Sequence, residues 1–99
     1  MLGRQGYRVR NDSATGVQVW RRQLLGSVAV LLFNGGAVPQ NVAFDFAEVG
    51  FDALTRVAVR DLYAGATLGV GFVGSFVAEA VPPHGVRMLT CQVPLHQEL

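Results

Sequence analysis

The sequence predicts an all-β protein, an antiparallel two-sheet β-sandwich of seven or eight strands with Greek-key-like connections. Short runs rich in Val, Leu and Phe alternate with turn-forming residues at intervals of about eight to twelve residues. The 99 residues include 12 Gly and 4 Pro, and no stretch has the period and length of a long amphipathic helix. A chain of this length fits one domain, residues 1–99.

The first part of the chain predicts three strands and three turns. Val17 and Val19 lie on one face of the second strand, and Trp20 lies on the other face with polar neighbours. The third strand is nearly all apolar, which predicts a central strand buried on both faces. Asn34 begins an Asn-Gly-Gly turn. The expected strands span residues 7–10, 17–23 and 27–33, and the turns span residues 11–16, 24–26 and 34–36.

The second part predicts four or five further strands and one helical turn. Val42, Phe44 and Phe46 alternate with Ala43 and Asp45, so the first three should face the core. The expected strands span residues 41–46, 55–62, 70–81 (one bent strand or two) and 86–93, with the helical turn at 47–50 and loops at 63–69 and 82–85. The core should contain Val30, Leu32, Phe44, Val57 and Val59.

Composition and charge narrow the possible functions. The eight basic residues are all Arg and are scattered, and the net charge is +1, so no basic patch indicates nucleic-acid binding. The single cysteine, Cys91, excludes an internal disulfide and disfavours a thiolate metal cluster; it is expected to be an inert core thiol.

Hydrophobic residues make up 51% of the chain. This predicts either apolar surface covered by a partner or simply a Val-rich sandwich with Gly turns.

Membrane association is not predicted. Residues 62–78 carry no charge and reach the lower limit of about 17 residues for a spanning helix. Their glycines and strand-like flanks favour β-structure instead. Residues 1–10 lack the apolar core of a secretory signal, and nothing else in the sequence indicates a compartment.

No cofactor, metal or catalytic site is predicted. Gly69, Gly71 and Gly74 match a dinucleotide-binding pattern, but Pro82 would stop any helix after about two turns, and no acidic residue lies about twenty residues further on. These glycines are therefore interpreted as points where a strand bends. His84 and His96 have no spacing that indicates a metal site. A glycosidase would need two carboxylates about 5–10 Å apart. The acidic residues are instead expected on outward faces and loops: Asp45, Glu48, Asp52, Asp61 and Glu79.

Aromatic side chains offer candidate binding residues. Trp20, with Tyr7 and Tyr63, could form an interface or a platform on which sugar rings stack. Asn11 begins an Asn-Asp-Ser sequon within a turn, a candidate glycosylation site.

Several segments occur together in an order typical of one family. They are residues 2–6 (Leu-Gly-Arg-Gln-Gly), 19–22 (Val-Trp-Arg-Arg) with Leu24, 28–34 (Val-Ala-Val-Leu-Leu-Phe-Asn), 59–63 (Val-Arg-Asp-Leu-Tyr), followed by Leu68-Gly69 and Gly74-Ser75-Phe76, and 81–86 (Val-Pro-Pro-His-Gly-Val). Because these segments occur in this order, the chain resembles the C-terminal β-sandwich domain of glycoside hydrolase family 27. This family contains the α-galactosidases (melibiases) and α-N-acetylgalactosaminidases. It departs from the family at Gln23, where Pro is usual, at Tyr63, where Trp is usual, and in the short turn at Leu25-Gly26.

The resemblance implies an accessory role. The family's catalytic aspartates lie on a (β/α)₈ barrel that these 99 residues do not contain, so no catalytic residue can be assigned here. The leading hypothesis is a non-catalytic domain that packs against and stabilises such a barrel. We expect a barrel-facing apolar patch near the N-terminal strands, with Trp20 in it, so that the domain binds a barrel or self-associates. The alternatives are a carbohydrate-binding module and a free-standing protein-interaction domain.

Overall fold

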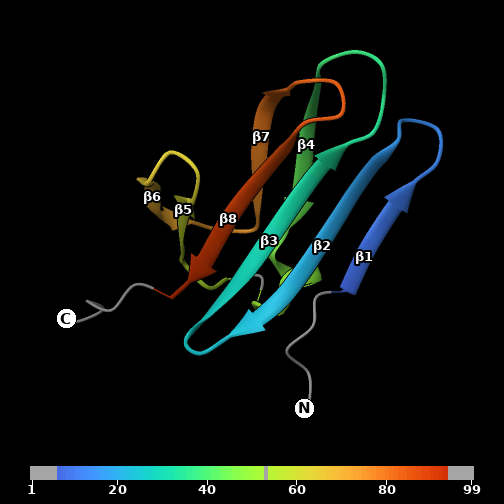
Figure 1. Ribbon diagram of the computed structural model, residues 1–99. Coiled ribbons are helices and arrows are strands. Elements are labelled where there is room, and N and C mark those ends of the chain that lie inside the picture. The colour runs from blue at the N-terminus through green and yellow to red at the C-terminus, as the bar shows by residue number, and fades with distance from the viewer. Residues whose placement is uncertain (1–6, 53, 94–99) are drawn as a thin grey trace.

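The computed structural model describes residues 7–52 and 54–93, which form eight strands and one 3₁₀ turn (Figure 1). Every strand pairing is antiparallel, and the predicted fold class is confirmed. The elements are β1 (Tyr7–Asp12), β2 (Val17–Leu24), β3 (Ser27–Asn34), β4 (Gln40–Asp45), η1 (Phe46–Val49), β5 (Val57–Asp61), β6 (Ala66–Phe72), β7 (Ser75–Val81) and β8 (Val86–Gln92).

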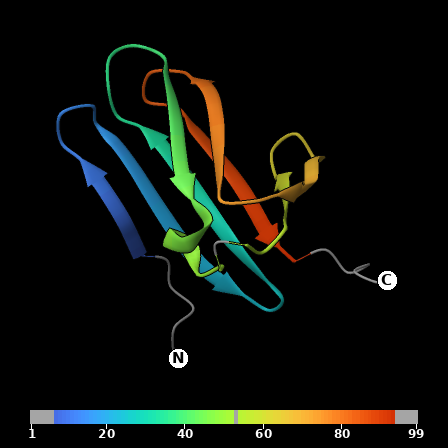
Figure 2. The same cartoon turned by 180° about the vertical axis from the view of Figure 1, so that it is seen from behind.

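The strands form two layers of unequal size. The larger sheet has the order β1-β2-β3-β8-β5-β6, and the smaller sheet consists of β4 and β7. Seen from behind, β4 and β7 cross in front of the middle of the larger sheet (Figure 2). The chain therefore leaves the large sheet after β3, returns for β5 and β6, leaves again for β7 and returns as β8. As a result, the small sheet covers only one face of the large one.

The core lies between the two sheets and is built from alternating apolar residues. Burial along β4 follows the predicted alternation, since Val42, Phe44 and Phe46 are buried while Ala43 and Asp45 are exposed. The rings of Phe44 and Phe46 meet edge to face with centroids 5.5 Å apart, a favoured aromatic geometry. The five residues predicted for the core are all confirmed as buried: Val30, Leu32, Phe44, Val57 and Val59.

Asn34 joins the two sheets through a buried side chain. Its Nδ2 donates to the carbonyl oxygens of Val38 at 2.8 Å and Val81 at 2.9 Å. Its Oδ1 accepts from the Gly36 N–H at 2.9 Å and from Gln40 Nε2 at 2.6 Å. Both N–H donors and both acceptor positions of the Asn34 side-chain amide are thereby engaged. Asn34 is the last residue of β3 rather than the first residue of a turn, and the loop begins at Gly35.

The β1–β2 turn is held against the loop after β3. Gly35 N–H donates to the Gly16 carbonyl oxygen at 2.9 Å. Gly16 has φ +79°, and a Cβ there would lie 2.8 Å from the backbone of Gly35. Glycine is required at this position by both the backbone angle and the close approach.

Further predictions of the boundaries and burial of strands were also wrong. Asn11 and Asp12 belong to β1 rather than to the turn, because they pair with Gln18 and Val17. β6 starts at Ala66, within the predicted loop 63–69, because pairing with β5 extends the strand there. β3 is central, as predicted, but is fully buried only on one face, because its other face has no covering sheet.

The uncharged segment 62–78 forms a turn, β6 and part of β7. Among the described residues, no helix has the length and apolar character needed to cross a bilayer.

Candidate interaction surface

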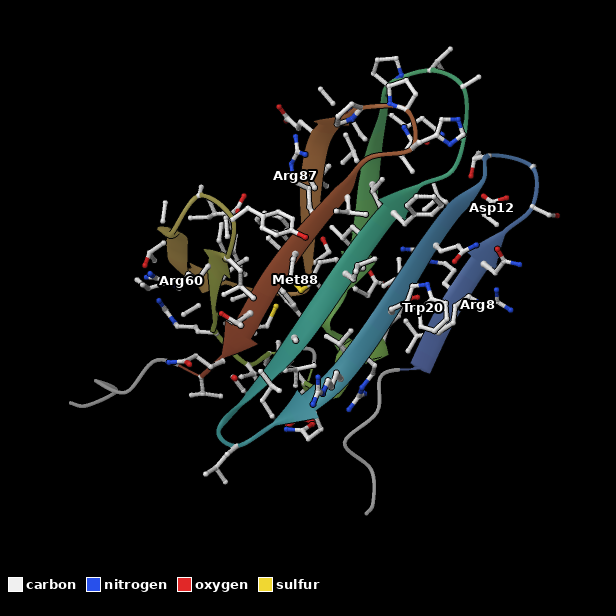
Figure 3. The ribbon with its side chains drawn as sticks, in the orientation of Figure 1. Arg8, Asp12, Trp20, Arg60, Arg87 and Met88 are labelled. Carbon is white, nitrogen blue, oxygen red and sulfur yellow. The ribbon has the colours of Figure 1, made fainter. Side chains whose placement is uncertain are left out.

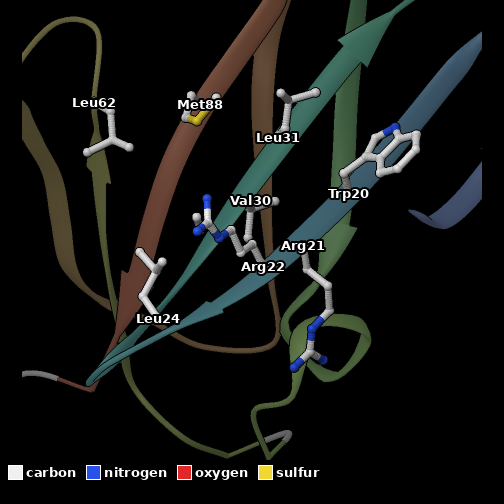
Figure 4. Close-up of a pocket in the computed structure, with 9 residues that line it drawn as sticks. Trp20, Arg21, Arg22, Leu24, Val30, Leu31, Leu62 and Met88 are labelled. Atoms are coloured by element: carbon white, nitrogen blue, oxygen red, sulfur yellow. The ribbon is translucent and has the colours of Figure 1, made fainter. Parts of the chain in front are cut away.

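The outward face of the six-stranded sheet carries an apolar groove. Cross-strand pairing places Trp20 of β2 opposite Leu31 of β3, and Leu31 opposite Met88 of β8. Leu62, just after β5, donates its backbone N–H to the Met88 carbonyl oxygen at 2.9 Å and extends this row. The hollow has a volume of about 460 Å³. We call it the outer groove, lined by Trp20, Arg22, Leu24, Leu31, Leu62 and Met88 (Figure 4).

The alternation of β3 explains why the outer groove is apolar. Strands place successive side chains on opposite faces, and an antiparallel sheet exposed on one side usually alternates apolar and polar residues. In β3 the inward residues Val28, Val30 and Leu32 are buried, yet the outward residues Ala29 and Leu31 are apolar and half-buried. The sequence of this strand therefore suits a sheet covered on both faces, although the small sheet covers only one of them.

The polar and aromatic groups of Trp20 are already engaged within the domain. Its Nε1 donates to Gln18 Oε1 at 2.9 Å. The Arg8 guanidinium carbon lies 5.8 Å from the centroid of the indole ring, within the range of a cation–π interaction. Because its N–H is already hydrogen-bonded, the half-buried indole ring offers apolar surface, and no free hydrogen-bond donor, to the groove.

Exposed arginines flank the apolar row at its β1 end and along one side. Arg8 pairs with Trp20 at the β1 side, while Arg22 belongs to a row that runs through Ala29 and Thr90 to Arg60. Figure 3 shows Arg8 and Trp20 on one side of Met88 and Arg60 on the other. Arg8, Arg22 and Arg60 are all exposed.

Among the described strand residues, none on this outward face is acidic. Asp12 and Asp61, at the ends of β1 and β5, pair with the buried residues Val17 and Leu89, so their positions belong to the inward register. Each also accepts backbone N–H groups from the turn that follows it. The charged residues on this face are therefore all positive within the described strands.

The described side chains of Tyr63 and Asn11 do not line the outer groove. Tyr63 is 71% exposed in the β5–β6 turn. Tyr7 pairs with Arg21 through the backbone of β1, but its side chain lies outside the description, as do residues 2–6 and His96. Asn11 is exposed and pairs with Gln18. It lies in an edge strand rather than in the predicted turn, and its glycosylation stays a prediction.

The carboxylates have structural surroundings. Glu48 Oε1 accepts the Asp45 N–H at 2.8 Å, and Glu48 Oε2 lies 3.4 Å from Arg10 Nε. Asp52 and Glu79 are exposed. Within residues 7–52 and 54–93, no three His, Cys, Asp or Glu side chains are grouped so that they could hold a metal ion. The carboxylates of Asp12, Glu48 and Asp61 therefore make turn and edge contacts, whereas Asp52 and Glu79 lie exposed.

Cys91 and the glycine pattern also have structural explanations. Cys91 is buried on β8, and burial raises the pKa of its thiol from 9.0 to about 12, so the nucleophilic thiolate is scarce at neutral pH. Gly69 and Gly71 lie in β6 and Gly74 in the turn to β7, where its φ is +86°. His84 is exposed in the β7–β8 turn.

Comparison with known proteins identifies the family. A family model described as the alpha galactosidase C-terminal beta sandwich domain matches residues 14–91. The chain belongs to this family. The chain is 31% identical over 91 residues to a probable alpha-galactosidase of Dictyostelium discoideum. It is 32% identical over 90 residues to alpha-galactosidase 2 of Arabidopsis thaliana. Each match covers 90% of this chain but only 23% and 22%, respectively, of those proteins.

Solved structures support the fold of this α-galactosidase sandwich domain. A family 27 β-L-arabinopyranosidase from Geobacillus stearothermophilus matches with a TM-score of 0.81 and 21% identity, covering 96% of this chain and 21% of that one. Alpha-galactosidase I from Mortierella vinacea matches with a TM-score of 0.80 and 22% identity, covering 94% and 24%. The chain therefore corresponds to the C-terminal domain of α-galactosidase-like glycoside hydrolases.

The apolar row could not be found from the sequence alone. Trp20 was predicted at an interface because it shares a strand face with Gln18 and Arg22. Its neighbours Leu31 and Met88 come from β3 and β8, which are far apart in the chain. The available signal was the uninterrupted apolar run of β3, which was interpreted as burial by the chain itself.

Proposed function

We propose that the chain is a non-catalytic accessory domain of an α-galactosidase-like glycoside hydrolase. In this role it packs against and stabilises a (β/α)₈ barrel that hydrolyses terminal α-galactosides. The observation that carries the proposal is the outer groove, an apolar row on the face of the large sheet that the small sheet leaves uncovered. The family assignment adds that the matched relatives are much longer than this chain.

The energetics favour a covered groove. Full burial of one large apolar side chain stabilises by about 1.5–3 kcal/mol. Trp20, Leu31 and Met88 are already half-buried, so covering them would contribute roughly 1 kcal/mol each. Contiguous apolar surface on a soluble domain is commonly an interaction site. A catalytic domain that packs on this surface would be stabilised by the contact. It would receive no catalytic side chain from the groove.

A chimeric enzyme tests the accessory role. In the chimera, this chain replaces the segment that it matches in the probable α-galactosidase of Dictyostelium discoideum. The enzyme is heated, and the half-life of its activity is measured by the hydrolysis of 4-nitrophenyl α-galactoside. We expect the chimera to outlast the same enzyme lacking that segment, because the domain covers and stabilises its neighbour. A chimera that is no more stable than the shortened enzyme contradicts the proposal.

The isolated chain provides a second test. It should not cleave 4-nitrophenyl α-galactoside above the buffer rate, since Asp12, Glu48 and Asp61 are engaged in turn and edge contacts and Asp52 and Glu79 lie exposed on the surface. Turnover that disappears in Asp61→Asn would show that this chain is catalytic by itself and would contradict the accessory role.

Carbohydrate binding is the second candidate function, and the exposed ring of Tyr63 is the feature that favours it. Trp20 contributes less to such a platform, because Arg8 lies over its ring and Gln18 accepts its N–H. Saturable binding of galactose measured by calorimetry and lost in Tyr63→Ser would favour this function over the accessory role.

A further inference from the structure

We propose that the outer groove receives an apolar side chain from a protein surface that also carries carboxylates around that side chain. The surface belongs to the catalytic portion of an α-galactosidase-like enzyme. This inference rests on the proposed function, because it specifies the chemistry of the surface on which the domain packs.

The shape of the groove selects a projecting partner. Its apolar side chains line a hollow of about 460 Å³ across β2, β3 and β8 instead of standing out as a ridge. A side chain that enters the hollow contacts Trp20, Leu31 and Met88 together. Buried apolar anchors that fill such pockets dominate the energy of protein interfaces.

The charge around the groove selects an acidic partner. Arg8, Arg22 and Arg60 are exposed on the same sheet face, and none of the described strand residues on that face is acidic. Covering a guanidinium group removes water from it, and this is costly unless a carboxylate takes the place of that water. Arg10, on the other face of the sheet, differs from these three arginines because it already has a carboxylate of this chain beside it. Glu48 Oε2 lies 3.4 Å from Arg10 Nε.

The same features disfavour other occupants. A second copy of the chain would bring two sets of exposed arginines together, and like charges in an interface oppose association. An anionic membrane would attract the arginines, but a hollow offers no apolar side chain to insert into the bilayer. Nucleic acid would meet an apolar centre where its phosphates need positive charge.

The chimeric enzyme also tests this proposal, through two pairs of substitutions. Arg22→Gln with Arg60→Gln removes two positive charges beside the groove. Val38→Glu with Leu54→Glu is the matched control, since it changes the net charge equally at two exposed sites, 61% and 88% accessible, that do not line the groove. Trp20→Ser removes the main apolar contact instead of charge.

The expected result depends on salt. The Debye length falls from about 30 Å at 0.01 M to about 3 Å at 1 M salt. The arginine pair of substitutions should shorten the thermal half-life of the chimera several-fold more than the control pair in ~0.01 M salt, and the difference should largely disappear in ~1 M salt. Trp20→Ser should shorten the half-life at both salt concentrations.

The outcomes separate the two proposals. If Trp20→Ser destabilises but the arginine pair behaves like the control pair, the acidic surface is refuted while the accessory role stands. If the unsubstituted chimera is no more stable than the shortened enzyme, the accessory role fails and this inference fails with it.

A measurement on the free chain tests the surface chemistry without the chimera. The indole N–H resonance of Trp20 is followed by NMR during titration with capped Asp-Glu-Phe-Glu-Asp and, separately, capped Lys-Lys-Phe-Lys-Lys. The acidic peptide should shift the indole and Met88 methyl resonances, and the basic peptide should shift them much less. Equal shifts with both peptides, or tighter binding to phosphatidylserine vesicles than to the acidic peptide, would overturn the proposal.

Discussion

Replacing Asn34 by Ala tests how the two sheets are joined. The bond from Asn34 Nδ2 to the Val81 carbonyl oxygen is buried, and the other three bonds of the amide are partly buried. Leaving a buried carbonyl unpaired costs about 1–3 kcal/mol, and each remaining bond contributes about 0.5–1.5 kcal/mol. We therefore expect Asn34→Ala to lower the free energy of unfolding by roughly 3–7 kcal/mol, a large part of the stability of about 5–15 kcal/mol typical of a domain.

Urea unfolding followed by the fluorescence of Trp20 measures this loss. Gln40→Ala is the matched control, because it removes one partner of Asn34 and an exposed bond to the Thr15 carbonyl oxygen. Its cost should be only about 1–2 kcal/mol. If Asn34→Ala costs less than about 1 kcal/mol, the amide does not join the sheets and this account of the core is wrong.

Three further predictions concern the core, the thiol and the fold. Phe44→Ala should destabilise by roughly 3–5 kcal/mol in urea unfolding; a loss below about 1 kcal/mol would place the ring at the surface. Because burial raises the pKa of Cys91 from 9.0 to about 12, the folded chain should react slowly with Ellman's reagent at pH 8, and its stability should fall only as the pH rises above about 9. Rapid labelling of the folded chain would contradict this. Far-UV circular dichroism should show β-structure, and a helical spectrum would refute the fold.

Local patterns allowed most of the core to be predicted. The alternation of Val42, Phe44 and Phe46 determines which face of β4 is buried, because strand periodicity is a property of the local sequence. The start of β6 at Ala66 was missed since Ala66 and Gly69 are weak local indicators of a strand. Their pairing with Asp61 and Val59 of β5 extends the strand, and such pairing is a tertiary effect.

The interaction surface was only partly predictable. Trp20 was expected at an interface from the polar residues on its strand face, but the outer groove depends on the register of β2, β3 and β8. Nothing in the local sequence specifies which strands become neighbours when they are distant in the chain. The apolar residues of β3 were assigned to the domain's own core because apolar runs do not reveal whether the covering layer lies in the same domain.

The most direct test of the accessory role is hydroxyl-radical footprinting of the outer groove. Oxidation rates of Trp20 and Met88 are compared between the free chain and the chimeric α-galactosidase, with Leu54, which is 88% exposed and does not line the groove, as the internal reference. If the groove packs against the catalytic portion, both groove residues should oxidise more slowly in the chimera while Leu54 keeps its rate. Unchanged rates at Trp20 and Met88 would contradict docking through this face.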